Sequence, residues 1–423
     1  MNQKKVAVGL SGGVDSAVCA LLLKKAGFDV VGVHLYCWPP ESVIEKEGLS
    51  RAEWMKKNGC RADEDRISAL KTALELEIPF KVLDFSEEYS KRVVDYFYRE
   101  YEAGRTPNPD VLCNSEIKFG LFLDWATENG FDYVAMGHYA RIVCDKSALP
   151  TTPFLENGNV NESSDSLRPV TRQFYPEYRD HAKTALRNLS KKADSLQHPC
   201  HVLIPKDRHK DQTYFLWKLT QKELAHVLFP LGEYLKSEVR QMAREADLSV
   251  AGKKDSQGIC FIGPVNVKEF LARRLKDKPG LVVNKEGEIM GKHYGVWKYT
   301  IGERGGWEID VKAQRKLMKS GGTPILYVVE KDAKENLLIV AEADSAVGRS
   351  FEVEEINDLS GKLEGNESVL VRIRHGGELL KARPDWTNGA KVSLEKGVRG
   401  IASGQSAVFY SENGEVLGGG VIK

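Results

Sequence analysis

The stretch of sequence that decides the fold is Ser11-Gly12-Gly13-Val14-Asp15-Ser16. A short, β-prone apolar run over residues 6–10 precedes it, and a helical pattern of apolar residues over 17–25 follows it. A strand, a glycine-rich turn and a helix bring backbone N–H groups and the positive end of the helix to one point, where phosphate oxygens bind. A carboxylate at this point is useful mainly when a Mg²⁺ ion lies between it and the phosphates, so Asp15 predicts Mg²⁺ there.

This loop carries neither of the two common phosphate-binding signatures. It lacks the Gly-Lys-Ser/Thr ending of the Walker A loop, and its glycines are spaced differently from those of the dinucleotide fingerprint. The six residues match the SGGxDS loop of the ATP pyrophosphatases. These enzymes resemble one another in splitting ATP between the α and β phosphates, so that AMP activates a carbonyl oxygen. A tight turn that merely caps a helix is the plainer alternative, but the order of strand, loop and helix favours the nucleotide site.

Length and composition set wide limits. With 423 residues, 42% of them hydrophobic and 29% charged, the chain is expected to form two or three globular domains. No apolar run approaches the length of a membrane helix, and the chain enters its first strand almost at once. We therefore expect no signal peptide and no membrane partner, and a cytoplasmic location. The net charge of +1 excludes a uniformly basic protein, so nucleic acid would bind at local patches.

Strands and helices alternate along the N-terminal part of the chain. Strands are predicted over 30–35, 80–83 and 133–136, and one helix over 51–76. The apolar side of this helix is expected to hold Ile67, Leu70, Leu74 and Leu76. The alternation predicts a doubly wound, Rossmann-like parallel sheet, in which ligands bind at the carboxyl ends of the strands.

Two of these strand ends carry candidate ligand contacts. Leu35 could touch the adenine, although an ordinary core leucine explains it equally well. Gly137 would allow a nucleotide to approach the backbone closely. His138 could contact substrate, but an isolated histidine is as often structural.

Two of the seven cysteines lie in segments that suggest reactivity. Two prolines in GRTPNPDVLCN (104–114) predict a stiff, extended loop, and a helix is predicted over 116–127. Cys113 would then lie near a helix N-terminus, where the dipole lowers a thiol's pKa. A buried, inert cysteine is the alternative, as it is for Cys19.

Cys260 lies in KKDSQGICFIG (253–263), where the lysines would favour a thiolate. Taken alone, it would be assigned to the core. Two thiols that meet beside a phosphate site could pass sulfur or form a transient disulfide. The cysteines contain no CxxC pair, so zinc-ribbon spacing is absent. Their odd number indicates a reducing compartment, in which reactive or packed thiols outnumber structural disulfides.

The rest of the chain predicts an insertion and two further units. Over about 145–205 the pattern dissolves into an irregular insertion, and a basic segment and a helix-like stretch over 215–228 follow it. The basic segment fits a nucleic-acid edge, although a solvated face is the commoner explanation. We expect an ATP-binding domain over 1–264, a small central α+β domain over 265–331 and a β-barrel over 332–423. Within the barrel, Asn413-Gly414 predicts a hairpin turn.

Several motifs together resemble the tRNA-specific 2-thiouridylases, which place sulfur on the wobble uridine of certain tRNAs. They occur in the family's order and cover nearly the whole chain outside the insertion. The motifs are SGGVDS, GRTPNPDVLCNSEIKF, MGHYAR, KDQTYFL, DSQGICFIG and GQSAVFY.

This resemblance implies a role for each matching residue. The implied ATP contacts are Gly9, Leu10, Ser11, Gly12, Gly13, Val14, Asp15, Ser16, Leu35 and Gly137. Asn108, Pro109 and Asp110 would face the target base. Cys113 would be the catalytic nucleophile and Cys260 the persulfide carrier, with a transient disulfide between them. The implied tRNA contacts are His138, Lys210, Asp211, Gln212, Arg374, His375 and Gln405, and alternation would place Arg372 on the same strand face as Arg374.

The implied reaction is ATP-dependent 2-thiolation of the wobble uridine. AMP would be transferred to the C2 oxygen with release of pyrophosphate, and sulfur from the persulfide would then replace AMP. The implied partners are the anticodon arm of tRNA and a persulfide donor protein. The chain departs from the family at its usual GQRKG, where it reads Gly302-Glu303-Arg304-Gly305-Gly306. Glu303 and Gly305 stand there in place of a neutral amide and a cation, on the expected RNA-facing surface. Methionine is frequent in the family where Leu35 stands.

Three alternatives stay open on the sequence. The chain could be another ATP pyrophosphatase, such as an amidating synthetase or argininosuccinate synthase, acting on a small carboxylate or ureido substrate. It could be a non-catalytic RNA-binding or sulfur-carrier protein with a relict nucleotide loop. As a question of cofactor, Asp110, Cys113 and Cys260 could hold an iron–sulfur cluster.

Overall fold

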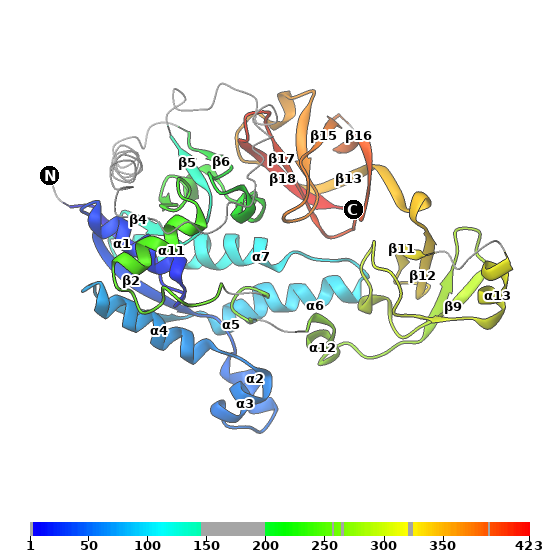
Figure 1. The fold of residues 1–423 in the computed structure, drawn as a ribbon, viewed down its shortest axis with the longest axis horizontal. Coiled ribbons are helices and arrows are strands. Elements are labelled where there is room, and N and C mark those ends of the chain that lie inside the picture. Colours follow the sequence, from blue (N-terminus) through cyan, green and yellow to red (C-terminus); the bar gives the residue numbers. More distant parts are fainter. Residues whose placement is uncertain (1–2, 145–198, 256–257, 264–265, 320–324, 388–389) are drawn as a thin grey trace, which may run out of the picture.

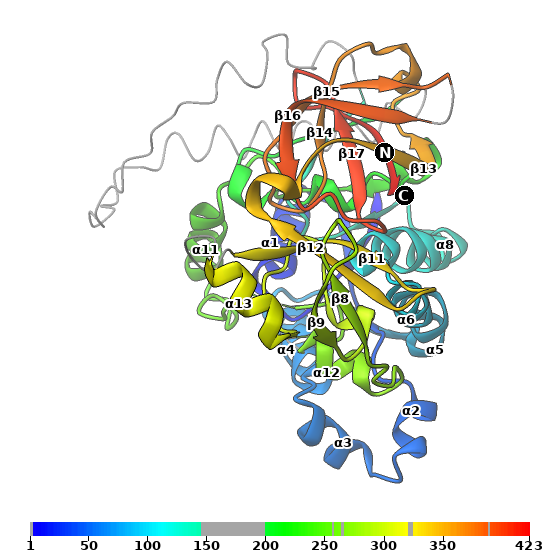
Figure 2. The same cartoon turned by 90° about the vertical axis from the view of Figure 1, so that its right-hand side faces the viewer.

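The computed structural model describes residues 3–144, 199–255, 258–263, 266–319, 325–387 and 390–423. Figure 1 shows an N-terminal α/β domain, a C-terminal barrel above helices α6 (Asp95–Glu102) and α7 (Pro109–Leu112), and a central sheet beside both. Turned by 90°, the barrel lies at one end and helices α2 (Glu41–Lys46) and α3 (Arg51–Asn58) at the other (Figure 2). Among the described residues, no helix is long and apolar enough to cross a membrane.

The N-terminal domain is built on a five-stranded parallel sheet in the order β3-β2-β1-β4-β7. Its strands are β1 (Lys5–Gly9), β2 (Asp29–Tyr36), β3 (Phe80–Asp84), β4 (Tyr133–Ala135) and β7 (Val227–Leu228). On one face, Val6 and Val8 pack with α1 (Val14–Lys25), α4 (Ala62–Glu75) and α11 (Lys236–Glu245). On the other face, Ala7 packs with α5 (Ser86–Tyr89), η1 (Ser90–Val94), α6, η2 (Cys113–Leu121) and α8 (Phe122–Glu128). Both faces are covered, so the doubly wound α/β fold is confirmed.

The single helix predicted over 51–76 is two helices. A capping box of Ser50 and Glu53 begins α3, and Gly59 ends it with a φ of 61° in the left-handed region. The predicted apolar side is wrong for Ile67, Leu70 and Leu74, which are 60%, 40% and 69% exposed, whereas Leu76 is buried as expected. Helix α4 instead buries small residues, which allow it to lie close to the sheet.

A continuous helical rod begins at Pro109 and runs through α7, η2 and α8 to Glu128. Proline is tolerated at the first helical position, so the extended loop predicted over 104–114 ends at Asn108. Cys113 therefore lies within the rod rather than before it.

The helix predicted over 215–228 is also absent as such. The chain forms the turn η6 (Thr213–Phe215), the short helix α10 (Gln221–Leu224) and strand β7, because β4 offers β7 a parallel partner. Most of the predicted insertion, residues 145–198, lies outside the described residues. At its base, β5 (Arg141–Val143) pairs with β6 (His201–Leu203), and a disulfide that the sequence did not predict joins Cys144 to Cys200.

Two further units follow. The central sheet has the order β10-β9-β8-β12-β11 and comprises β8 (Gly280–Val283), β9 (Ile289–His293), β10 (Glu308–Ile309), β11 (Leu326–Asp332) and β12 (Leu337–Glu342). The closed barrel comprises β13 (Val347–Asp358), β14 (Val369–Arg372), β15 (Leu380–Asp385), β16 (Lys391–Arg399), β17 (Ser406–Tyr410) and β18 (Val416–Ile422). β12 was expected in the barrel from residue 332 onward, but its parallel pairing with β8 places it in the central sheet.

The predicted turn at Asn413-Gly414 does join β17 and β18. The remaining elements are η5 (Arg208–Lys210), α12 (Val267–Ala272), η7 (Val296–Lys298), α13 (Val311–Lys319), η8 (Ala343–Ala346) and η9 (Leu363–Gly365).

A buried ion pair fastens the barrel to the N-terminal domain. The Arg372 guanidinium at the end of β14 donates to Oδ2 of Asp211 at 2.6 Å, and both side chains are at least 90% buried. Oδ1 of Asp211 accepts from the backbone and hydroxyl of Thr213. Arg372 was expected to share an exposed face with Arg374, but β14 ends at Arg372, and only Arg374 is exposed.

The variant Arg372→Ala leaves the Asp211 carboxylate buried without its cation. We expect the free energy of unfolding, measured by urea denaturation, to fall by about 3 kcal/mol. Arg374→Ala is the matched control, because it removes an exposed arginine two residues away and should change stability by less than about 0.5 kcal/mol. Equal losses in the two variants would contradict the importance of this pair.

Candidate active site

The glycine loop is closed by its own side chains and by α4. The Ser16 hydroxyl accepts from the Ser11 backbone N–H at 3.1 Å and donates to the Gly13 carbonyl at 3.1 Å. Gly12 has a φ of +75°, and a Cβ there would lie 2.3 Å from the carbonyl oxygen of Asp65. Glycine is therefore required at this position by both its backbone conformation and its neighbour.

The other predicted ATP residues lie around this loop, some of them in packing roles. A Cβ on Gly137 would lie 2.8 Å from the Ser16 backbone nitrogen, so Gly137 lets β4 approach the loop. Gly9 similarly accommodates Met136. The side chains of Leu10, Val14 and Leu35 are at most 5% exposed in this structure.

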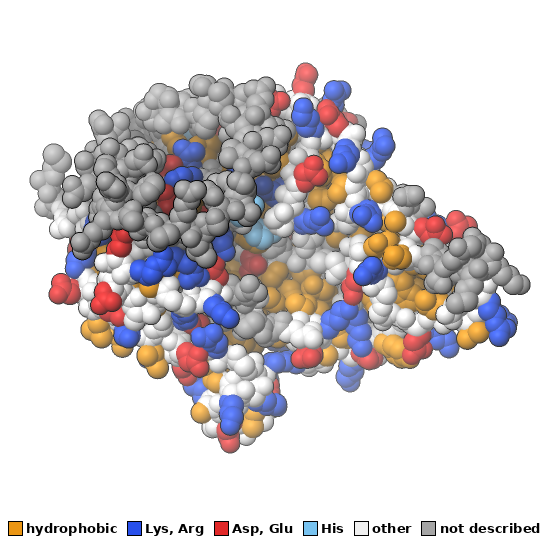
Figure 3. All heavy atoms as spheres, in the orientation of Figure 1, with side chains coloured by type: hydrophobic (Ala, Val, Ile, Leu, Met, Phe, Trp, Pro, Cys, Tyr) orange, Lys and Arg blue, Asp and Glu red, His pale blue; other side chains and the backbone are white. Residues whose placement is uncertain are grey.

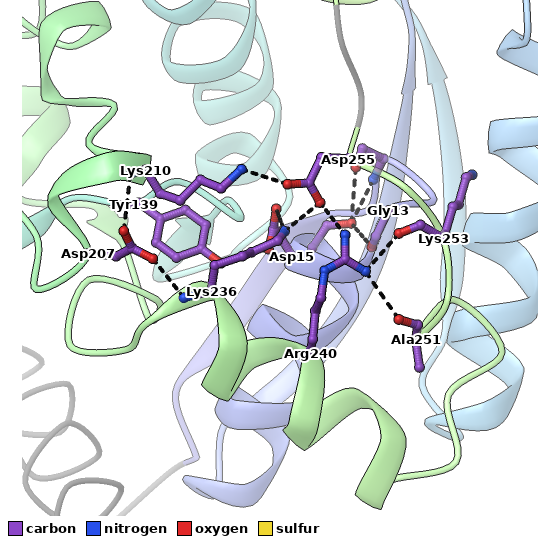
Figure 4. Close-up of polar contacts among 12 residues, drawn as sticks. Gly13, Asp15, Tyr139, Asp207, Lys210, Lys236, Arg240, Ala251, Lys253 and Asp255 are labelled. Carbon is purple, nitrogen blue, oxygen red and sulfur yellow. Dashed lines mark hydrogen bonds and ion pairs between the residues drawn. The ribbon is translucent and has the colours of Figure 1, made fainter. Parts of the chain in front are cut away.

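Asp15 lies in the first turn of α1 and is already neutralised. Nζ of Lys236 lies 2.6 Å and 2.7 Å from its two carboxylate oxygens, and the Tyr139 hydroxyl donates to Oδ1 at 2.9 Å (Figure 4). Lys236 also contacts Asp255 at 2.9 Å. Asp15 thus belongs to a network of ion pairs beside the glycine loop.

Further cations surround Asp255 and the loop. Lys210 and Arg240 bind the Asp255 carboxylate at 2.7 Å and 2.6 Å (Figure 4). Lys253 donates to the carbonyl of Gly12 at 2.8 Å and to Asp65 at 2.7 Å. Anions are attracted to such a site because cations and the positive end of α1 converge there.

The residues beside the loop suit a Mg²⁺ ion carried by a nucleotide rather than a resident ion. Among the described residues, no group of three or more His, Cys, Asp or Glu side chains could hold a metal. Asp15 offers a carboxylate in the first turn after the loop, and Mg²⁺ commonly takes one or two carboxylates together with phosphate oxygens. Asp15 and the phosphates would hold the ion, which would neutralise phosphate charge.

The two candidate thiols meet. Sγ of Cys113 donates a hydrogen bond to Sγ of Cys260 at 3.4 Å, although the residues are 147 positions apart in sequence. The backbone N–H of Cys260 donates to Oδ1 of Asp110 at 3.1 Å, and the Tyr89 hydroxyl donates to the Cys260 carbonyl at 2.6 Å. Phe261 has a φ of 64°, a conformation rare for a residue with a side chain. The Cys260 segment is thus held against the helical rod at several points.

The proton of this pair lies on Cys113. The hydrogen bond from Cys113, aided by the positive charge of Lys118, lowers the pKa of Cys260 to about 7 against the opposing effect of burial. Burial, together with the bond to Cys260, raises the pKa of Cys113 well above its usual value. The expectation that the helix dipole activates Cys113 is therefore wrong, because burial and the neighbouring thiolate dominate.

The cation beside the thiols is also different from the one expected. Burial alone would lower the pKa of Lys118, but the charges of Cys260 and Cys113 outweigh it and raise this pKa. Lys253, expected near Cys260, contacts the glycine loop instead. The sequence offered one signal for Lys118, because a helix that begins at Pro109 places it little more than one turn after Cys113.

The thiols and the glycine loop lie at the same edge of the sheet. The loop follows the carboxyl end of β1, and Cys37 follows the carboxyl end of the neighbouring strand β2. Cys37, Cys113 and Tyr89 share one buried cluster, against which Cys260 packs. This is the edge where ligands of doubly wound sheets bind.

The loop expected to face the target base is fixed by the barrel. Gln405 donates to the carbonyl oxygens of Thr106 and Pro107 at 2.9 Å and 3.3 Å. The backbone N–H of Thr106 donates to the carbonyl of Ser403. Asn108 and Pro109 are half-buried after this anchor, and burial raises the pKa of Asp110.

Most residues expected to contact tRNA serve internal contacts here. His138 is buried between Phe119 and Phe229, and its burial lowers its pKa well below the usual value. Gln212 bonds the backbone of Tyr139 in both directions, and Asp211 forms the pair with Arg372 described above.

Three of the residues expected to contact tRNA have charged or aromatic side chains that are at least partly exposed. Lys210 is half-buried and bound to Asp255, whereas Arg374 and His375 are exposed. The His375 ring lies 4.4 Å from the ring of Phe215, between centroids. The departure at Glu303 is accommodated by an ion pair, since Lys268 binds its carboxylate at 2.7 Å.

Five residues of the site were missed from the sequence, namely Lys118, Tyr139, Lys236, Arg240 and Asp255. Lys118, Tyr139 and Asp255 lie inside motifs that the resemblance used, but the resemblance assigned them no role. Lys236 and Arg240 fall one turn apart on an ordinary amphipathic helix, so only the tertiary packing of α11 identifies them.

The donors proposed for an iron–sulfur cluster are arranged differently from a cluster site. Among the residues with described positions, Cys113 and Cys260 contact each other directly, and Oδ1 of Asp110 accepts from a backbone N–H. Two thiols and one carboxylate fall short of the four thiolates that such clusters commonly use.

The coupling between the thiols gives a testable pH dependence. We expect alkylation of Cys260, followed by mass analysis of its peptide, to show a midpoint near pH 7 because its pKa is about 7. Cys113→Ala removes the main stabilising hydrogen bond and should move the midpoint upward, and Lys118→Met should do so to a smaller extent. Lys91→Met removes an exposed lysine and serves as the control. An unchanged midpoint in Cys113→Ala would contradict the assignment.

Comparison with family models covers nearly the whole chain. Residues 4–162 and 179–264 match the tRNA methyl transferase HUP domain, and 268–342 match the tRNA methyl transferase PRC-barrel domain. Residues 348–422 match the aminomethyltransferase beta-barrel domain. These ranges follow the N-terminal domain, the central sheet and the barrel.

Relatives that match over nearly their whole length identify the family more closely than the domain models do. The tRNA-specific 2-thiouridylase MnmA of Streptococcus agalactiae serotype Ia is 38% identical over 99% of this chain and 95% of its own length. That of Streptococcus thermophilus strain LMD-9 is 37% identical over 100% and 95%, and MnmA 2 of Geobacillus kaustophilus is 36% identical over the same shares. The glycine loop, the paired thiols and the three-part architecture agree with this likeness, and the chain belongs to the tRNA-specific 2-thiouridylase family.

Proposed function

We propose that this protein is a tRNA-uridine 2-sulfurtransferase that uses ATP to convert the wobble uridine of tRNA to 2-thiouridine, with AMP and pyrophosphate as further products. The observation that carries the proposal is the 3.4 Å contact between the sulfurs of Cys113 and Cys260 at the edge of the sheet that holds the glycine loop. Two adjacent thiols beside a phosphate site fit sulfur transfer to an adenylated oxygen.

The first step activates the uridine. Its C2 oxygen attacks the α-phosphorus of ATP, the bond to the bridging oxygen breaks, and pyrophosphate leaves as the N3 proton is lost. Backbone N–H groups of the loop and the positive end of α1 stabilise the charge that develops on the phosphate. The oxygen on C2, a poor leaving group by itself, becomes part of AMP.

The second step uses the asymmetry of the thiols. Cys260, the thiolate of the resting pair, is suited to take a sulfane sulfur from a donor protein. The terminal sulfur of the persulfide attacks C2, and AMP leaves with the oxygen. Cys113 then attacks Sγ of Cys260 as its thiol proton passes to the base and restores N3–H. The sulfur–sulfur bond of the persulfide breaks, a disulfide forms between the two cysteines, and the outer sulfur stays on the base. An external thiol must reduce this disulfide before the next turnover.

The tRNA would bind where the three units meet. In the orientation of Figure 1, the surface is hollowed between the barrel and the N-terminal domain, with hydrophobic side chains at its floor and Lys and Arg side chains around it (Figure 3). Exposed Arg374 and the adjacent, tilted rings of His375 and Phe215 suit phosphate and base contacts. The anticodon base must leave its stack to reach the thiols. Binding of the anticodon arm by the barrel and a cytoplasmic location stay predictions.

The decisive experiment incubates the protein with ATP, Mg²⁺, a sulfane-sulfur (persulfide) donor and unmodified tRNA, followed by nucleoside mass analysis. Cys113→Ser should abolish 2-thiouridine and leave ATP binding within about twofold, because Cys113 lies on the helical rod rather than on the glycine loop. Cys60→Ser changes a half-buried cysteine that is not part of the pair and is the control.

Two outcomes would contradict the proposal. One is full thiolation by Cys113→Ser. The other is pyrophosphate release that is equally fast without RNA, which would indicate an ATP pyrophosphatase acting on a small carboxylate.

A further inference from the structure

Three cations converge on two carboxylates beside the glycine loop, and Lys236 lies between the carboxylates (Figure 4). Its Nζ is within 2.7 Å of both oxygens of Asp15 and 2.9 Å from Oδ1 of Asp255. Lys210 and Arg240 contact Asp255 from other directions. The cluster therefore places three cations next to the expected phosphate site.

The backbone holds Lys236 at a fixed place relative to the loop. Lys236 is the first residue of α11, and its N–H donates to Oδ2 of Asp207 at 2.8 Å. Helix α11 packs against α1 through buried Val239 and Ala243. Because α1 begins directly after the glycine loop, this packing also sets the distance from Lys236 to the loop.

Asp255 gives Lys236 a second anchor. Arg240 fixes the Asp255 segment by donating to the carbonyl oxygens of Ala251 and Lys253 as well as to the carboxylate. Burial opposes ionisation of Asp255, but the hydrogen bonds from Lys210 and Lys236 outweigh it and lower its pKa to about 2. When another cation takes Asp15, Lys236 can therefore keep one carboxylate partner and turn its remaining N–H donors elsewhere.

We propose that Lys236 belongs to a polyphosphate subsite: when Mg²⁺–ATP binds, its ammonium group exchanges Asp15 for the β- and γ-phosphates, with Asp255 positioning it. This inference rests on the proposed function, because it assigns a residue to the ATP which that function requires. As the bond between the α-phosphorus and the bridging oxygen breaks, the electron pair moves onto pyrophosphate. Lys236 then neutralises the charge on the leaving group.

The test separates the two ends of the nucleotide. Calorimetry on the full-length protein measures binding of Mg²⁺–pyrophosphate and of AMP to the wild type and to Lys236→Met. We expect pyrophosphate binding to weaken at least about tenfold, the factor that one charge-assisted hydrogen bond supplies. AMP affinity should stay within about twofold, because AMP lacks the β- and γ-phosphates.

Matched variants distinguish this role from a purely structural salt bridge. Arg244→Met removes an exposed cation from the same helix and should leave both affinities unchanged. Lys236→Arg keeps the charge and should recover much of the pyrophosphate affinity. Asp255→Asn should weaken pyrophosphate binding, but less than Lys236→Met does. If Lys236→Met does not fold, Lys236→Arg and Asp255→Asn carry the test.

The outcomes also separate this inference from the proposed function. Unchanged pyrophosphate binding in Lys236→Met, or equal losses for AMP and pyrophosphate, would overturn the subsite while wild-type thiolation stands. A wild-type protein that binds neither ATP nor pyrophosphate would contradict both.

Discussion

The parallel pairing of β1 with β2 is the constraint on which the rest of the site depends. Their register sets Gly9 opposite Val33, and the Leu10 backbone N–H donates to the Val33 carbonyl at 2.8 Å. The chain leaves β1 as the glycine loop and leaves β2 at Cys37, beside the thiol cluster. Side-by-side strand ends thus bring a phosphate-binding turn and a sulfur pair to one edge, although their residues are scattered over the chain.

The segment 253–263 connects these two halves of the site. Near its start, Lys253 contacts the Gly12 carbonyl and Asp255 gathers three cations, and near its end Cys260 meets Cys113. The described parts of this segment, 253–255 and 258–263, thus contribute contacts to both halves of the site.

The barrel holds the loop of residues 106–108 (TPN), which leads into the helical rod. Gln405 holds the loop by its carbonyl oxygens, and the Asp211–Arg372 pair fixes the barrel to the segment after the insertion. Asp211 and Gln405, which the resemblance assigns to tRNA, therefore also hold domains together. Substitutions at these positions would act on RNA binding and on domain packing at once, so stability must be measured beside activity in such variants.

The sequence by itself determined the α/β class, the position of the glycine loop and the two thiols, because strand–turn–helix periodicity and short motifs are local signals. It misjudged elements whose limits depend on neighbours, such as the split at Gly59 and the assignment of β12 to the central sheet. Tertiary structure alone decided which thiol carries the charge and which cations serve the site. Burial and long-range contacts set pKa values, and tertiary packing alone brings Cys260 to Lys118 and Lys236 to Asp15.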